Sequence, residues 1–318
     1  MTPDLLQQTS KIVIPGGAGL VGQNLVARLE ELGCSEILVI DKSAANIKVL
    51  QALHPQIRSV CADLSEPGEW ELLFCDAQAV VMLQAQIGAR NREPFIRNTI
   101  EATRNVLAAM SKAHVPYLVH VSSSVVNSAA DDLYTTAKRE QERLVHESDI
   151  PHVVLRPTLM FGWFDRKHLG WLSRFMRRTP VFPIPGHGRY LRQPLYVGDF
   201  CEIIISCLKS RPVDRSFDIT GLQRIHYIDL IYQIRRAIGA KCAIVRIPYK
   251  LFRLLLRVWA LFDPNPPFTT EQLAALTAGD VFDVIDWEVI FGVPATPLDA
   301  ALERTFRDPR YRDIVLEF

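Results

Sequence analysis

The 318-residue chain lacks the sequence features that are typical of several large classes of protein. It has no excess of basic residues, because 36 Lys and Arg stand against 35 Asp and Glu, for a net charge of +1. This balance argues against a protein that tracks nucleic-acid phosphates. The six cysteines include no C-x-x-C pair, and the histidines show no zinc-like spacing. We therefore expect reduced thiols and no metal site.

Targeting and membrane-spanning segments are also missing from the sequence pattern. The first residues, MTPDLLQQTSK, have neither the basic start nor the apolar run of a signal peptide, which predicts a cytoplasmic protein. The most apolar stretch, residues 251–262, is too short to span a bilayer and contains Arg253 and Arg257. We expect a core helix there, with an interfacial helix as the alternative.

The sequence does contain a regular alternation of short apolar runs and helix-period segments. The runs cover residues 11–15, 36–40, 58–61, 79–83, 117–121 and 153–155, and the segment 20–32 is typical of the intervening helices. Continuous apolar strands that alternate with helices predict an α/β fold, with a doubly wound parallel sheet buried on both faces. We expect a dinucleotide-binding domain over residues 11–157, plus interleaved later segments, and a smaller α/β substrate lobe mainly over 158–318.

A glycine-rich turn follows the first predicted strand. Gly16, Gly19 and Gly22 have the spacing G-x-x-G-x-x-G, in the order strand, loop and helix. Such glycines allow a tight turn, a close approach of backbone to a pyrophosphate, and close packing of the helix. The helix N-terminus at Leu20 and Val21 offers unpaired N–H groups to the phosphates.

Polar residues at the ends of the next strands extend this predicted dinucleotide site. Asp41 ends the second strand, 19 residues after Gly22, where an acidic residue is expected to bind the adenosine ribose. Its charge favours NAD over NADP, although Lys42 follows directly. The predicted cofactor contacts are completed by residues after the third and fourth strands, namely Asp63, Leu64, Gln84 and Ala85.

A second group of polar residues follows the fifth strand. Serines 122–124 end that strand, and Tyr134 and Lys138 are spaced i, i+4, so both point from one face of a helix. A neighbouring ammonium favours the phenolate form of a tyrosine and brings its pKa toward the useful range. Lys138 also suits the nicotinamide ribose, while a serine hydroxyl steadies the substrate oxygen.

These motifs, together with LRPTLMFG and the ending IFGVPATPLDAAL, resemble the extended branch of the short-chain dehydrogenase/reductase superfamily. That branch contains NAD-dependent sugar-nucleotide epimerases and dehydratases with a Rossmann-type sheet. The resemblance implies Ser123 as the catalytic serine, with Ser124 as the alternative, and Tyr134 with Lys138 as acid/base and partner. It also implies Arg192, or the nearby Arg189, as the clamp for a nucleotide-sugar diphosphate, and a homodimer.

Three functions follow as hypotheses. Dehydration is disfavoured, because Ser124 and Val125 stand where dehydratases of this branch carry an acidic pair. The first hypothesis is an epimerase that transiently oxidises a nucleoside-diphosphate sugar, at C4. The alternative is an NAD-dependent dehydrogenase or reductase of a non-nucleotide alcohol, such as a sterol-like or aryl alcohol, which the apolar residues 251–268 would suit. The third is a non-catalytic NAD-binding subunit.

Overall fold

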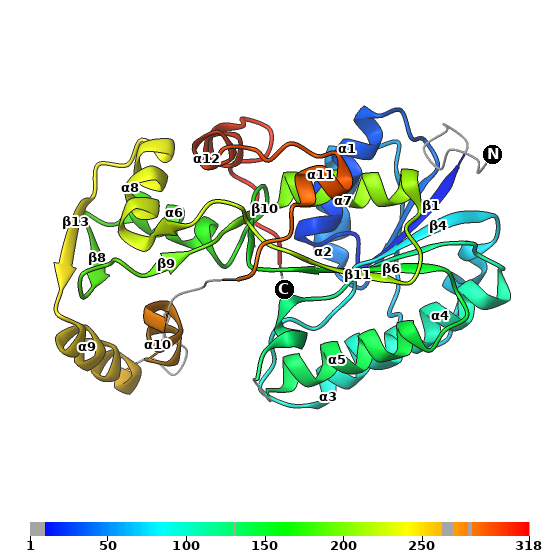
Figure 1. Cartoon of the computed structure of the whole chain (residues 1–318), viewed down its shortest axis with the longest axis horizontal. Helices are drawn as coiled ribbons and strands as arrows, with labels where there is room; N and C mark the ends of the chain where they lie inside the picture. The colour runs from blue at the N-terminus through cyan, green and yellow to red at the C-terminus, as the bar shows by residue number, and fades with distance from the viewer. Residues whose placement is uncertain (1–9, 130–131, 263–269, 279–281, 318) are drawn as a thin grey trace.

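The chain is represented by a computed structural model that describes residues 10–129, 132–262, 270–278 and 282–317. A seven-stranded sheet has the order β11-β6-β5-β4-β1-β2-β3, and all neighbouring strands are parallel. The carboxyl ends of these strands point toward a second lobe (Figure 1). The strands are β1 (Lys11–Pro15), β2 (Ile37–Asp41), β3 (Arg58–Cys61), β4 (Ala77–Met82), β5 (Leu118–Val121), β6 (His152–Pro157) and β11 (Arg215–Ile219).

Both faces of the sheet are buried, as the continuous apolar strands predict. In β1 the side chains of Ile12 and Ile14 join one hydrophobic core and that of Val13 joins the other. The first core is covered by α1 (Leu20–Glu31), α2 (Ala44–Leu53), α7 (Val197–Ser210) and α11 (Trp287–Phe291). The second is covered by η1 (Glu69–Phe74), α4 (Ala102–Lys112) and α5 (Leu133–His146), and α4 is preceded by α3 (Glu93–Phe95) and η2 (Ile96–Glu101).

The second lobe has a core of its own. Its largest strand pair is β8 (Val181–Pro185) with β13 (Ala243–Ile247), which are parallel. The core is filled mainly from α6 (Leu169–Arg178), α8 (Tyr227–Ile238) and α12 (Leu298–Arg307). Short strand pairs, β7 (Met160–Phe161) with β10 (Leu195–Tyr196) and β9 (Leu191–Arg192) with β12 (Ile225–His226), link these elements. Because α7, β11 and α11 lie between segments of this lobe in sequence but pack on the first sheet, the chain passes between the lobes several times.

Helix ends follow from local sequence. We predicted a helix over residues 20–32 that ends at Gly33, and α1 spans Leu20–Glu31. Gly33 has a φ of 84° and its N–H donates to the carbonyl of Glu30 at 2.9 Å, so glycine suits this turn. At the start of α5, Asp132 accepts from the backbone N–H of Thr135 at 3.0 Å, which is an N-cap.

We expected a core helix over residues 251–262, and this expectation is wrong because most of the helix surface is exposed. The helix α9 (Tyr249–Phe262) lines a groove together with Pro183 of β8 and Ile247 of β13, and Leu254 and Leu261 are 56% and 82% exposed. The helix α10 (Thr270–Ala278) follows in sequence. Within the described ranges, no helix combines the length and the apolarity that crossing a membrane requires.

Candidate active site

The glycine turn between β1 and α1 packs tightly at two positions and is open at the third. Gly16 has a φ of 74°, and a Cβ there would lie 2.4 Å from the backbone nitrogen of Gln84. A Cβ at Gly22 would lie 2.2 Å from the carbonyl oxygen of Gly17. At Gly19 the nearest atom would be the Gly16 oxygen, at 3.6 Å, which is ordinary contact. Gly16 and Gly22 are therefore needed for packing within the protein, while Gly19 leaves room beside the loop.

The N-terminus of α1 borders the same open space beside Gly19. Gly19 is the N-cap residue of α1 and supplies no side-chain cap, so the first N–H groups, at Leu20 and Val21, have no capping side chain. Unpaired N–H groups and the positive end of the helix dipole suit an anionic phosphate.

Asp41 lies beside the glycine turn at the end of β2. One of its carboxylate oxygens accepts from the N–H of Ala18 and the other from the N–H of Ser43, both at 3.0 Å. Burial raises the pKa of Asp41, and these two backbone hydrogen bonds oppose the rise. The Asp41 carboxylate therefore connects the glycine turn with the β2–α2 turn. The predicted contact with the adenosine ribose is expected at this position. The backbone carbonyl of the neighbouring Lys42 accepts a hydrogen bond from the Cys61 thiol.

The turn after β3 carries a charged cluster that sequence motifs do not reveal. Asp63 accepts from the N–H of Ser65 at 2.9 Å, and Arg97 of η2 lies 3.3 Å from Asp63 and 2.8 Å from Glu66. Asp63 is thus already paired with a cation, while its neighbour Leu64 is buried in the second core.

The turn after β4 crosses over the glycine loop. Leu83 donates its N–H to the carbonyl of Pro15 at 2.9 Å, and Gln84, followed by Ala85, comes next. The Oε1 atom of Gln84 is buried and has no hydrogen-bond partner among the described residues. Together with the open position at Gly19 and the uncapped α1, this unpaired acceptor fits a site that binds a polar cofactor across the edge of the sheet.

Ser123 and Tyr134 meet at the carboxyl end of β5. Ser123 begins the short helix η3 (Ser124–Asn127), Tyr134 lies in the first turn of α5, and their side chains are hydrogen-bonded. Burial raises the pKa of Tyr134, and the hydrogen bond with Ser123 opposes the rise. The structure therefore pairs Tyr134 with Ser123 rather than Ser124. The hydroxyl of Ser122 instead donates to Glu142 at 2.7 Å.

Lys138 lies one turn farther along α5 and is buried. Its ammonium donates to the carbonyl of Val121 at 3.0 Å and to the side chain of Gln141. Burial lowers the pKa of Lys138 to about 7, and the charge of Glu142 opposes the decrease. We expected Lys138 to lower the pKa of Tyr134, but the influences on that phenol come from burial, Ser123 and Asp132.

Gln141 is a site residue that the motifs did not indicate. Its Nε2 donates to the carbonyl of Gln84 at 3.1 Å and to the hydroxyl of Thr103 at 2.8 Å. It therefore connects Lys138 with the end of β4. The only signal in the sequence is its position three residues after Lys138, on the buried side of α5.

The two predicted arginines lie in the second lobe. Arg192 pairs with Ile225 across β9 and β12, and its charge acts on the buried Tyr227 and on His168. Arg189 is exposed in the preceding turn, where its N–H donates to the ring of His187 at 2.8 Å.

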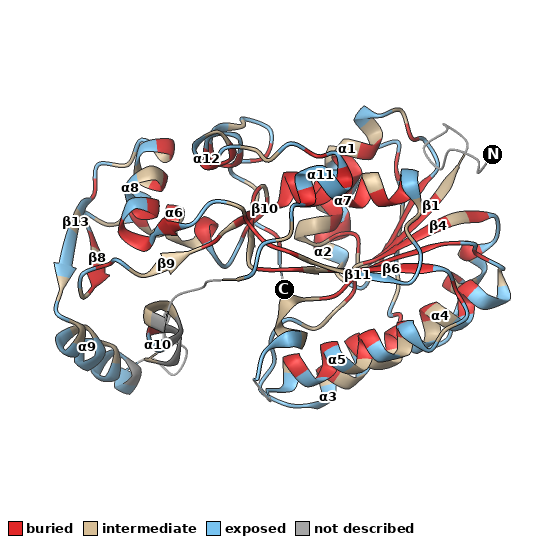
Figure 2. Ribbon diagram, viewed as in Figure 1, coloured by how far each residue is buried: buried red, intermediate tan, exposed pale blue. Residues whose placement is uncertain are grey.

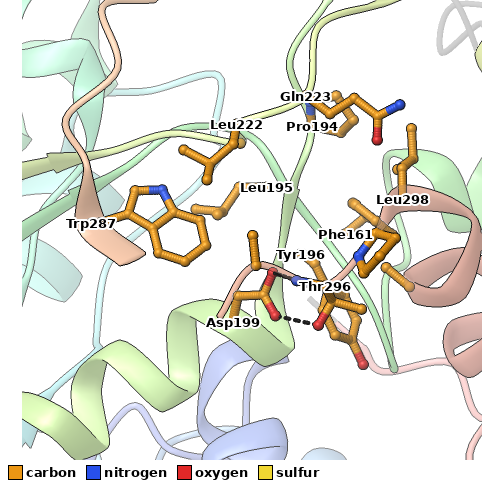
Figure 3. A pocket seen from close by; sticks show the side chains of 14 residues that line it. Phe161, Pro194, Leu195, Tyr196, Asp199, Leu222, Gln223, Trp287, Thr296 and Leu298 are labelled. Carbon is orange, nitrogen blue, oxygen red and sulfur yellow. Dashed lines mark hydrogen bonds between the residues drawn. The ribbon is translucent and has the colours of Figure 1, made fainter. Parts of the chain in front are cut away.

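A small cavity of about 130 Å³ is lined by residues of both lobes, and Tyr134 is not among them (Figure 3). On one side of it the Asp199 carboxylate accepts from the N–H of Thr296 at 3.0 Å and from its hydroxyl at 2.6 Å. The described residues contain no group of three or more His, Cys, Asp or Glu side chains arranged to hold a metal ion.

Known proteins match this chain over most of its length. The model of the NAD dependent epimerase/dehydratase family matches residues 12–219. A 4-hydroxy-2-methyl-3-oxo-4-farnesyl-3,4-dihydroquinoline-1-oxide ketoreductase of Stigmatella aurantiaca is 26% identical over 84% of this chain and 86% of its own length. A decarboxylating sterol-4-alpha-carboxylate 3-dehydrogenase of Schizosaccharomyces pombe is 27% identical, over 91% and 94% respectively.

Solved structures with the same fold include UDP-glucose 4-epimerase of Thermotoga maritima, with a TM-score of 0.74 at 17% identity over 93% of this chain and 97% of that one. This likeness extends through the second lobe as well as the sheet. The chain is an NAD-dependent enzyme and belongs to the NAD-dependent epimerase/dehydratase family.

Proposed function

We propose that this enzyme interconverts a secondary alcohol and a ketone on a large apolar, lipid-like molecule. The observation that carries the proposal is a groove of about 570 Å³ between α9 and the β8–β13 pair. Every residue that lines it is apolar: Pro183, Ile247, Phe252, Leu255, Leu256, Val258, Trp259 and Phe262. A groove of this size and lining suits the body of an apolar ligand, and among the described residues that line it the Trp259 indole N–H is the one polar side-chain group.

The residues at the end of β5 supply the proton chemistry. The glycine turn and Asp41 would hold NAD, which would supply a hydride acceptor for oxidation and a hydride donor for reduction. In oxidation the Tyr134 phenolate takes the proton from the substrate hydroxyl, and in reduction the Tyr134 phenol returns that proton to the substrate oxygen. Ser123, hydrogen-bonded to Tyr134, holds the same substrate oxygen. Lys138, one turn farther along α5, would hold the nicotinamide ribose.

The names of the sequence relatives support an apolar substrate. One acts on a farnesylated quinoline oxide and another on a sterol carboxylate. The first is a ketoreductase and the second a 3-dehydrogenase, so both names describe chemistry between a ketone and an alcohol. The helix α9, whose residues line the groove, lies in the second lobe, on the lower side of the view in which α5 also lies (Figure 1).

A second candidate is the C4-epimerase of a nucleoside-diphosphate sugar. It is favoured by Arg192, which lies half-buried beside Tyr227 in the segment that resembles the diphosphate clamp of that family. A planar guanidinium is well shaped for a diphosphate. The same Ser123, Tyr134 and Lys138 would serve both reactions, so only the substrate distinguishes them.

To test the proposal, the protein is incubated with NAD and an apolar alcohol in detergent micelles: a ring-hydroxylated sterol, a long-chain secondary alcohol or a prenylated aryl carbinol. A separate incubation contains NAD and UDP-glucose. We expect NADH to accumulate with at least one of the apolar alcohols. Tyr134→Phe should lower kcat/KM by about 10²–10⁴-fold. The matched variant Tyr232→Phe, on the exposed side of α8, should behave as wild type.

Two outcomes would contradict the proposal. Formation of the C4 epimer of UDP-glucose without net NADH would establish the second candidate instead. Equal turnover of apolar alcohols by the wild type and by Leu256→Asp, which places a charge in the groove, would show that the groove does not bind the substrate.

A further inference from the structure

The helix α9 presents a second apolar surface that does not line the groove. Leu251, Leu254, Val258 and Leu261 follow one another at i, i+3, i+7 and i+10, which places them in one row along the helix. We call these four residues the outer row. Each is exposed, from 44% for Val258 to 82% for Leu261, and Figure 2 shows most of α9 as exposed. Only Val258 also borders the groove.

A row of basic side chains runs beside the outer row. Lys250, Arg253 and Arg257 each precede a residue of the outer row by one position, so the two rows lie about 100° apart around the helix. All three are exposed. We call these residues the basic row.

The charge of this region is strongly one-sided. Residues 241–262 contain five Lys and Arg and no Asp or Glu, although the whole chain has 36 basic and 35 acidic residues. The basic row belongs to this segment, which runs from just before β13 to the end of α9. Such a surface is complementary to one that is both anionic and apolar.

We infer that the outer row and the basic row of α9 dock on an anionic lipid bilayer. An exposed apolar row with cations beside it is the pattern of a helix that lies in the plane of the membrane interface. The 14 residues of α9 extend about 21 Å, so the helix lies on the bilayer and does not cross it. The cations would meet the anionic headgroups while the leucines enter the acyl boundary.

Docking in this orientation would place the groove next to the bilayer. Val258 belongs to the outer row and also lines the groove, and Phe262, which is 84% exposed, lies at the end of the same helix. An apolar molecule could then pass from the membrane into the groove without crossing water. The docking inference stands on the surface of α9 and does not depend on the proposed reaction.

The experiment measures co-sedimentation of the full chain with phosphatidylcholine vesicles, with or without phosphatidylglycerol. We expect binding to the vesicles that contain phosphatidylglycerol, weakened by added salt because the charges are screened. The double variant Arg253→Glu/Arg257→Glu should weaken binding by roughly tenfold or more. Lys48→Glu/Arg58→Glu, which reverses two exposed charges on the dinucleotide-binding side, is the matched control and should bind as wild type.

Equal binding by both double variants, or by neutral and anionic vesicles, would overturn the inference. A dimer that Leu254→Ser/Leu261→Ser converts to a monomer, with no vesicle binding by the wild type, would assign the surface to a second copy of the chain. Vesicle binding without oxidation of any apolar alcohol would contradict only the proposed function. Oxidation of such alcohols in detergent without vesicle binding would contradict only the docking.

Discussion

The individual residue with the most unusual environment is Lys138. Its ammonium is enclosed by the Val121 carbonyl and the Gln141 side chain, and burial lowers its pKa to about 7 from 10.5. Its protonation state therefore changes near neutral pH, in contrast to an exposed lysine. The motif Y-x-x-x-K predicts the position of this lysine but not its enclosure, because Gln141 is held in turn by residues from β4 and α4.

This shift predicts a dependence of stability on pH. Between about pH 7 and pH 10.5 the unfolded chain keeps the Lys138 proton while the folded chain loses it, so the free energy of unfolding rises with pH. Urea unfolding at several pH values should show wild type gaining stability relative to Lys138→Met by about 1 kcal/mol per pH unit above about pH 7. Parallel curves for the two proteins would contradict the shift. Lys48→Met, at an exposed position, should show no such change relative to wild type.

At the scale of single elements, the glycine turn shows why similar residues in one motif have different roles. Gly22 touches the loop backbone, whereas Gly19 leaves open space beside the N-terminus of α1. The spacing of the glycines was enough to predict the turn. The motif also predicted the three roles, namely the tight turn at Gly16, the approach to a pyrophosphate at Gly19 and the close packing at Gly22. The structure shows the turn at Gly16 and the packing at Gly22, and the approach at Gly19 stays a prediction.

Two single substitutions separate these roles. Gly22→Ala places a Cβ 2.2 Å from a carbonyl oxygen and should lower the free energy of unfolding by roughly 3 kcal/mol. Gly19→Ala should stay within about 1 kcal/mol of wild type but bind NAD at least about tenfold more weakly, since the methyl group enters the phosphate position. Denaturant unfolding and NAD titration measure the two effects. Unchanged NAD affinity in Gly19→Ala would argue against a diphosphate at this position.

At the scale of the whole molecule, the two lobes are joined by a buried polar contact. Asp199 of α7 packs with the sheet side of the molecule, and Thr296 precedes α12 of the second lobe (Figure 3). Burial raises the pKa of Asp199 and the two hydrogen bonds from Thr296 oppose the rise. The hydrogen bonds from Thr296, together with the charges of Arg28 and Arg304, therefore favour the carboxylate form at this poorly solvated position.

A pair of variants tests this contact between the lobes. Asp199→Ala leaves the Thr296 N–H and hydroxyl unpaired and should lower the free energy of unfolding by about 1–3 kcal/mol. Asp199→Asn keeps an acceptor for the N–H and removes a buried charge, so it should cost less than half as much. Thermal and denaturant unfolding of both variants provide the measurement. Equal losses would mean that the charge itself, rather than hydrogen bonding, holds the lobes together.

The sequence by itself determined those elements of the fold that depend on interactions between neighbouring residues. Apolar periodicity and turn residues predicted six of the strands of the sheet and the helix after Gly19, because each depends on neighbours a few residues away. The glycine spacing and Asp41 likewise indicated NAD. The strand β11 was not predicted, because its polar sequence RSFDI becomes a strand only by pairing with β6, about sixty residues earlier.

Only the tertiary structure decided what distant segments bring together. It paired Tyr134 with Ser123 rather than Ser124, enclosed Lys138 with Gln141, and left α9 exposed although its composition suits a core. The physical reason is the same in each case. A side chain's partners and its exposure to water depend on which elements lie against it. The strand β4 and the helix α4 are far from Lys138 in sequence, and β8 is far from α9.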